Sequence, residues 1–253
     1  MEHKTAETAR TAAALRSQLN QIAAASQMLE TSTVGERSRS YLAVINQGIC
    51  RMLRVVGRME LEERLSEDSP RLSPSYIDLS ILLEDLGHRL ESILAAIGVR
   101  FTFSCPAALL IYADSELLQQ LLLEVITHLA LAGTEINLTA VKRDRNIHIT
   151  VSDSGPGTAD GRPAMPDVLE TAEESLSLDL ARRIADLHGG TLVVSPGADL
   201  GLSLAVSIPV NDDQPSELLE TFPKNWNGGG FDPALVALSE LLPANSFLPE
   251  NLG

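Results

Sequence analysis

Hydrophobic and polar positions alternate with helical spacing through the first part of the chain. In residues 5–30 apolar side chains recur every three or four positions, and no Pro or Gly interrupts them. A turn is indicated at residues 31–35, and the same spacing resumes over residues 36–65. Two helices of similar length joined by a short turn predict an antiparallel helical hairpin over residues 1–66.

Such a hairpin cannot bury the apolar faces of both helices by itself. A second copy supplies a matching surface, and two hairpins then form a four-helix bundle. We therefore expect a homodimer that associates through residues 1–66.

A different pattern begins after this hairpin. Residues 67–77 are charged and contain Ser and Pro, which is typical of a linker, and Asp78 can cap the helix that follows. The later helices are expected at residues 78–97, at 115–132 and in a run that ends at His188. The strands are expected at residues 99–104, 109–113, 135–142, 146–153, 191–195 and 202–208. Residues 78–210 thus predict an α/β sandwich with one mixed sheet and helices on a single face, and the whole chain is of the α+β class.

Residues 211–253 differ in composition from the rest. They contain five of the thirteen Pro residues, three consecutive Gly residues at 228–230 and the only Trp, Trp226. Asp232 followed by Pro233 predicts the start of a short helix with Leu residues along one face. This tail either packs on its own domain, which is the default, or binds another protein.

Charge and cysteine content narrow the classes of partner. Residues 1–66 hold nine Lys/Arg and seven Asp/Glu, whereas the remainder holds ten and twenty-seven, and the net charge is −15. This acidity disfavours nucleic acids and anionic lipids as partners. Cys50 and Cys105 stand alone in apolar runs, so both are expected to be buried and reduced. Without a secretion signal or a membrane span in the sequence, we expect a cytoplasmic protein.

The most informative motif follows the strand that ends at Asp153. The sequence reads Asp-Ser-Gly-Pro-Gly from Asp153 to Gly157, and residues 178–195 include Leu-Ala-Arg-Arg-Ile and Leu-His-Gly-Gly-Thr-Leu. Together with the helix at 114–132 and the hairpin, these runs resemble the sensor histidine kinases over residues 10–210. The resemblance implies a helical dimerisation hairpin, followed by an ATPase domain of the histidine kinase type. It also implies that Asp153, Gly155 and Gly157 would hold an adenine ring.

The resemblance also shows where family residues are replaced. The family's phosphoacceptor box reads H-E-L-R-T-P-L-N, so Leu15 and Arg16 place Ala13 at the position of the phosphorylated histidine. Alanine cannot accept a phosphoryl group. All five histidines of the chain lie outside this box, at positions 3, 88, 128, 148 and 188.

The family's second ATPase motif, the N-box, maps onto Glu124, His128, Leu131 and Ala132. Glu124 could act as the acidic residue that activates water if ATPase activity is retained. His128 stands where the family has a magnesium-binding asparagine, and magnesium prefers oxygen ligands. Leu131 and Ala132 replace a phosphate-facing cation and an aromatic ring of the pocket.

The third motif, a second glycine box, reads Glu-Glu-Ser-Leu-Ser-Leu at residues 173–178 instead of G-x-G-L-G-L. Glycines at this point let backbone N–H groups hold the phosphates. Here Glu173 and Glu174 would repel them, and the lid at 158–174 carries five acidic residues against Arg162 alone.

Several of these residues also have simpler interpretations. Asp153 and the two glycines of its motif either hold adenine or form only a turn after a strand. Glu124 and His128, four residues apart, suit a helix-surface polar pair better than a metal site, because two ligands are too few. His188 is explained as a residue at a helix end.

One cationic stripe is a candidate partner surface. Arg51, Arg54 and Arg58 fall on one side of the second helix, where they could meet an acidic receiver domain or simply remain solvated.

The sequence thus favours a pseudokinase of two-component signal transduction, a dimeric module that binds a response-regulator receiver domain or another kinase and needs no cofactor or metal. The alternative is a divergent but active histidine kinase or ATPase that uses ATP and magnesium. A phosphotransfer protein is a third alternative, but it requires a histidine in the middle of the bundle.

Overall fold

The computed structural model describes residues 15–17, 19, 20, 22, 36–66, 72–130, 135–154, 176–197, 201–210 and 230–251. The chain forms two compact units. The helical unit comprises Met1–Pro70 together with Pro223–Gly253, and the sheet unit comprises Arg71–Phe222. In sequence, the sheet unit is therefore an insertion between the two parts of the helical unit.

The helical unit is built on α2 (Glu36–Ser66), which confirms the helix predicted at residues 36–65. Most of the expected first helix lies outside the described residues, but those described between 15 and 22 are helical. Arg16 on this helix bonds through its guanidinium to both carboxylate oxygens of Glu60 on α2. This ion pair joins the two helices of the predicted hairpin.

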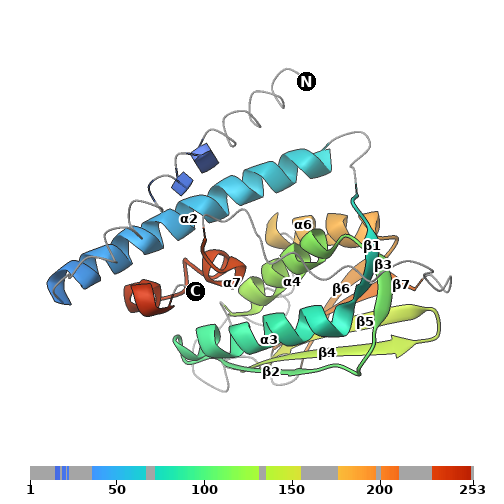
Figure 1. The fold of residues 1–253 in the computed structure, drawn as a ribbon. Helices are drawn as coiled ribbons and strands as arrows, with labels where there is room; N and C mark the ends of the chain where they lie inside the picture. The colour runs from blue at the N-terminus through green and yellow to red at the C-terminus, as the bar shows by residue number, and fades with distance from the viewer. Residues whose placement is uncertain are drawn as a thin grey trace. The chain divides into compact units, whose positions relative to one another are not determined.

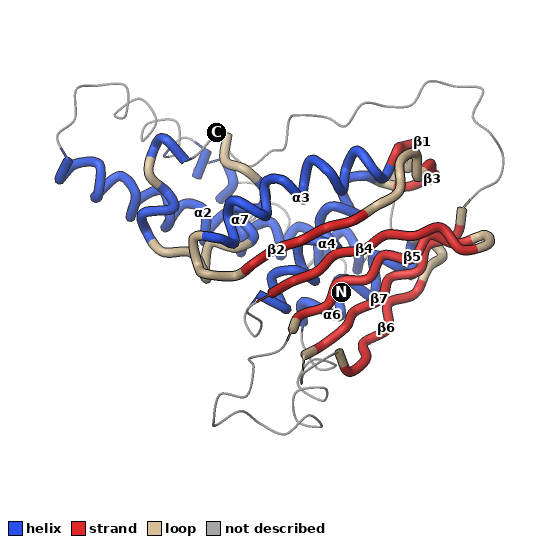
Figure 2. The backbone as a smooth tube through the Cα atoms, turned by 90° about the horizontal axis from the view of Figure 1, so that it is seen from below, coloured by secondary structure: helices blue, strands red, loops and turns tan. Residues whose placement is uncertain are grey.

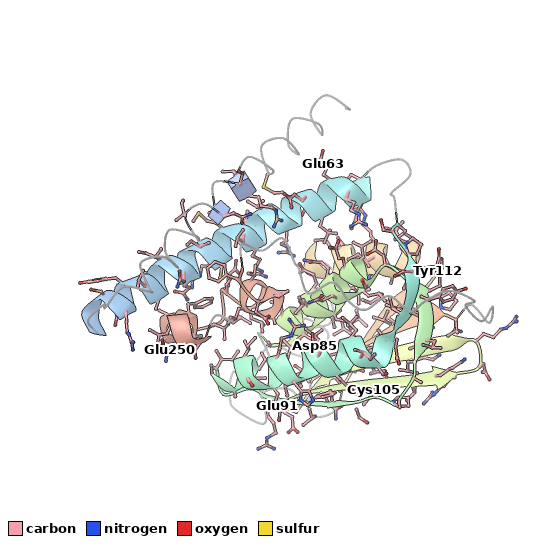
Figure 3. All side chains as sticks on the ribbon, in the orientation of Figure 1. Glu63, Asp85, Glu91, Cys105, Tyr112 and Glu250 are labelled. Carbon is pink, nitrogen blue, oxygen red and sulfur yellow. The ribbon has the colours of Figure 1, made fainter. Side chains whose placement is uncertain are left out.

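The remainder of the helical unit is the C-terminal segment, which we define as residues 230–251. It contains α7 (Pro233–Ala237) and two short 3-10 helices, η2 (Ala244–Phe247) and η3 (Pro249–Asn251), shown in red tones in Figure 1. The Asp232 carboxylate accepts a hydrogen bond from the Ala234 N–H at 2.7 Å, so the helix starts where the sequence predicted. All three helices of the segment contact α2; Glu250, labelled in Figure 3, marks η3.

The sheet unit contains three described helices: α3 (Leu79–Ala95), α4 (Ser115–Ala130) and α6 (Leu176–Leu187). Its strands are β1 (Ser75–Asp78), β2 (Arg100–Ser104), β3 (Leu110–Ala113), β4 (Glu135–Arg143), β5 (Asn146–Asp153), β6 (Thr191–Pro196) and β7 (Leu202–Pro209). Asp78 caps α3 through the Ser80 N–H at 3.0 Å, as expected. After α3, Gly98 takes a positive φ of 76°, which suits a residue without a side chain.

Five strands form one mixed sheet in the order β2-β4-β5-β7-β6. β2 runs parallel to β4, and the other neighbours pair antiparallel. Alternate residues of β5 and β7 are buried, and α3, α4 and α6 cover a single face of the sheet (Figures 1 and 2). The predicted mixed sheet with helices on one face is therefore confirmed for these five strands.

Two expectations are wrong at the start of this unit. Residues 75–77 were assigned to the linker 67–77, but they form β1, which pairs antiparallel with β3 in a separate two-stranded sheet. The unit thus has two sheets and not one. A strand of four residues is too short for its alternation to stand out next to the charged, Pro-containing run before it.

The two cysteines are both free thiols. Cys50 is fully buried, as predicted, and burial raises the pKa of its thiol to about 12. Cys105 is only half-buried, which corrects the expectation for this residue, because it follows the end of edge strand β2 (labelled in Figure 3). Among the described helices, none combines the length and apolar character that crossing a membrane requires.

The close contact between α3 and β2 can be tested at Gly87. A Cβ atom there would lie 2.6 Å from the Phe103 ring, whereas one at Gly57 in α2 would meet only Arg16 at an ordinary 3.5 Å. We expect Gly87→Ala to lower the free energy of unfolding by about 1–3 kcal/mol through overpacking. Gly57→Ala should raise it by about 0.5–1 kcal/mol, because Ala favours helix. Urea unfolding measures both, and equal effects would contradict the packing described.

Candidate functional site

Asp153 occupies the last position of β5 and is buried. One of its carboxylate oxygens accepts a hydrogen bond from the Leu202 N–H at the start of β7, at 2.5 Å. The side chain therefore joins the ends of two neighbouring strands. Gly155 and Gly157, the other two expected adenine-side residues, lie outside the described residues.

Glu124 and His128 lie one turn apart on α4, the helix that carries the candidate N-box. Glu124 is buried, so the expected helix-surface polar pair is wrong for this residue. His128 is half-buried, and burial lowers the pKa of its imidazole below the usual value of 6.5. At neutral pH the ring is therefore uncharged.

The described residues provide no cluster of three or more His, Cys, Asp or Glu side chains that could hold a metal ion. A neutral imidazole presents nitrogen to a metal, whereas magnesium requires oxygen ligands in octahedral geometry. The donor set seen on α4 thus fits magnesium poorly. Leu131 and Ala132, the next two N-box positions, lie outside the described part of the chain.

A small network fixes α4 relative to α6. Asp114 precedes α4 and accepts hydrogen bonds from the Leu117 N–H at 3.1 Å and the Ser73 N–H at 3.0 Å. The backbone N–H of Asp114 donates to His188 Nε2 at 3.1 Å, and His188 Nδ1 lies 2.8 Å from the Ile184 carbonyl. With Nε2 as the acceptor, Nδ1 is the ring nitrogen that donates to the Ile184 carbonyl.

His188 is thus a residue at a helix end, as the sequence suggested. In addition, its ring links the end of α6 to the residue that precedes α4 through hydrogen bonds. No local pattern indicated this pairing, because Asp114 and His188 are 74 positions apart.

The second glycine box falls at the start of α6. Helix α6 begins at Leu176, and Leu178 is buried within the sheet unit. Glu173 and Glu174, together with the lid at 158–174, lie outside the described residues. Ala13, at the phosphoacceptor position, also lies outside them.

The cationic stripe on α2 is engaged by the chain's own C-terminal segment. Arg51 Nε donates to the Ser239 carbonyl at 3.2 Å, and Arg54 forms an ion pair with Glu240 at 2.6 Å. Arg58 is half-buried. Arg51 and Arg54, which were proposed for a partner protein, therefore already have partners within the helical unit.

Comparison with known proteins matches part of the chain to one family of ATPases and to histidine kinases. Residues 113–212 match the model of the histidine kinase-, DNA gyrase B- and HSP90-like ATPases. The signal transduction histidine-protein kinase BaeS of Escherichia coli strain K12 is 26% identical over 157 residues, 56% of this chain and 33% of that protein. The adaptive-response sensory kinase SasA of Prochlorococcus marinus strain MIT 9313 is 24% identical over 165 residues, 59% of this chain and 44% of that protein.

The fold agrees with these matches. The crystal structure of full-length ShkA in complex with AMPPNP superposes with a TM-score of 0.63 at 22% identity, covering 81% of this chain and 45% of that one. The Acinetobacter baumannii histidine kinase AdeS gives a TM-score of 0.52 at 16% identity, covering 78% of this chain and 96% of that one. The matched region spans from a third to under half of the two curated relatives above.

The buried imidazole of His128 predicts a pH effect on stability. Because burial lowers its pKa in the folded chain, the unfolded chain binds a proton below about pH 6.5 that the folded chain excludes. The contribution of the neutral ring is thus complete above that pH and is lost as the pH falls through the folded-state pKa.

We expect acidification from pH 8 to pH 5 to destabilise the natural chain more than the His128→Gln variant, whose side chain does not titrate. Urea unfolding at a series of pH values measures this difference. If the free energies of unfolding of the natural chain and of His128→Gln fell in parallel below pH 6.5, His128 would not be a buried, uncharged ring.

Proposed function

From the premise that this chain is a member of the histidine kinase family, we propose that it is a dimeric pseudokinase that acts in two-component signalling by binding, without phosphoryl transfer. The match to the histidine kinase-type ATPases and to a signal transduction histidine kinase supports a role in two-component signalling. The observation that carries the proposed loss of catalysis is the half-buried, uncharged His128 on α4.

His128 occupies the position at which the resemblance implies the magnesium-binding asparagine. An asparagine offers an amide oxygen, which is a ligand that magnesium accepts. A neutral imidazole offers neither that oxygen nor a positive charge that could attract phosphate. This substitution removes the means by which a kinase neutralises the charge of a triphosphate.

Two further sequence features support the proposal. Ala13 stands at the phosphoacceptor position, so the helical hairpin has no histidine there. Glu173 and Glu174 replace glycines of the second glycine box and add negative charge where phosphates would bind. Glu124 is the one catalytic acid of the resemblance that is present, and it belongs to the rival proposal of a divergent active ATPase.

The proposed homodimer rests on the free side of α2. Tyr41, Val44, Ile45, Met52 and Val55 are all exposed apolar residues of this helix. Successive spacings of four, seven and three residues separate Tyr41, Ile45, Met52 and Val55. Such spacing is typical of the line of contact between two packed helices, which we call the seam. On the first helix, Leu15 and Ile22 are exposed and seven residues apart.

A second copy of the chain fits this seam, because the apolar stripe is long and carries no charge that would oppose its own copy. A receiver domain or another kinase remains the proposed signalling partner. Since Arg51 and Arg54 bind the C-terminal segment, that partner must use other residues or displace the segment.

The proposed loss of phosphate binding predicts an unusual order of affinities. Titration calorimetry should show that adenosine binds at least as tightly as ATP, because the lid and the second glycine box bring more carboxylates than cations to the phosphates. Magnesium should leave the ATP affinity unchanged, and radiolabelled ATP should leave no phosphohistidine on the chain. Micromolar binding of ATP that depends on magnesium would instead establish the rival, an active ATPase or kinase.

If the seam on α2 is the dimer interface, one charged substitution in it should dissociate the dimer. Val55 in α2 is 54% exposed, and Val193 in β6 of the sheet unit is a matched control at 56%. Val55→Asp should convert the dimer to a monomer, since an unpaired carboxylate would be buried in the interface. Val193→Asp should leave the mass unchanged. Light scattering after gel filtration measures both, and a dimer that survives Val55→Asp would exclude this seam.

A further inference from the structure

The C-terminal segment is attached to α2 by extensive apolar burial. Apolar side chains from both its helical and its irregular parts are at most 4% exposed: Phe231, Ala234, Leu235, Val236, Leu238, Leu242 and Phe247. An appended tail that followed the surface would leave most of such residues in water. The segment is therefore folded as part of the helical unit, 160 or more positions away in sequence from most of α2.

Polar side chains of α2 complete this contact. Asn46 donates to the Phe247 carbonyl at 3.3 Å, Gln47 to the Leu242 carbonyl at 2.7 Å and Arg51 to the Ser239 carbonyl at 3.2 Å. These carbonyls lie between or at the ends of short helices, where backbone acceptors lack helical partners. The side chains of α2 thus satisfy acceptors that the segment cannot satisfy by itself.

An ion pair also joins the C-terminal segment to α2. Arg54 is nearly covered, with 12% of its side chain exposed, and it pairs with Glu240. Counted along the helix, Asn46, Cys50 and Arg54 are spaced four residues apart and therefore share one side of α2. We call the side defined by Asn46, Gln47, Arg51 and Arg54 the clasp face.

We propose that the C-terminal segment is a tethered ligand of the clasp face, which it covers and thereby closes to any other acidic protein segment. The chemistry of this face suits an apolar peptide with free backbone carbonyls and one carboxylate. The C-terminal segment of the same chain is such a peptide. Because the peptide is linked through residues 211–229, its effective concentration is high and a separate partner must displace it. The proposal stands on these contacts alone and does not depend on the loss of kinase activity.

Cys50 provides a natural reporter of this contact. It is fully buried on the clasp side of α2, and burial raises the pKa of its thiol to about 12, so it reacts slowly while covered. In a Cys105→Ser chain, Cys50 is the only thiol. The rate at which a thiol reagent labels Cys50 then measures release of the segment.

We expect Phe247→Ala to raise the Cys50 labelling rate at least about tenfold, because loss of a buried aromatic ring weakens docking. The control Glu250→Gln, at an exposed position of the same segment, should leave the rate unchanged. Arg54→Glu should raise the rate by about twofold to fivefold through repulsion from Glu240, and adding Glu240→Arg should restore it. Unchanged labelling in Phe247→Ala and in Arg54→Glu would overturn the proposal.

A second experiment tests closure of the face directly in the full chain. A protease recognition sequence inserted between Asp213 and Gln214 allows the link to be cut after folding. A fluorescent synthetic peptide with the sequence of residues 230–251 should bind the cut chain by exchange but not the uncut chain. Equal binding to both forms would show that the tethered segment does not close the face, and absence of binding to the cut chain would show that the segment is not its ligand.

Discussion

The arrangement of the helical unit follows from one constraint on α2, whose apolar side chains lie on more than one side. A helix with apolar residues around most of its circumference is stable only when it is enclosed. Leu53 is buried on the side of α2 that includes Glu60, the partner of Arg16, and Asn46 on the clasp face is buried beneath the C-terminal segment. Only the stripe containing Tyr41 and Val55 stays exposed in one copy. The proposed dimerisation and the docking of the segment thus both cover apolar side chains of the same helix.

The sequence predicted those parts of the fold whose signal is local. α2 and the β4–β5 hairpin have long periodic patterns, and the Asp232–Pro233 pair marks a helix start by its own chemistry. β1 was missed because its four residues take their structure from pairing with β3, some 35 positions later. The tail was expected to pack on its own domain, but its packing on α2 could not be foreseen, since Asn46 and its acceptor on Phe247 are 201 positions apart.

For the candidate site, motifs located the residues but not their surroundings. Glu124 was placed on a helix surface because its neighbours in sequence gave no measure of burial, whereas the packing of α4 encloses it. The stripe of Arg51 and Arg54 was interpreted as available to a partner, because a sequence shows which side of a helix is cationic but not what already lies against it. The sequence gives the type of each residue, but only the folded chain shows whether its side chain is accessible to a partner.

The same distinction limits what Asp153 implies about nucleotides. Its carboxylate accepts the Leu202 N–H, and without it a buried donor between β5 and β7 would lose its partner, at a cost of about 1–3 kcal/mol. The fold alone therefore accounts for an aspartate at this position, whether or not adenine binds. Ala13, by contrast, stands at a position where the resemblance implies a residue that serves only to accept phosphate. A residue of a catalytic motif that also supports the fold is weak evidence for catalysis, and the replaced position that serves chemistry alone carries more weight.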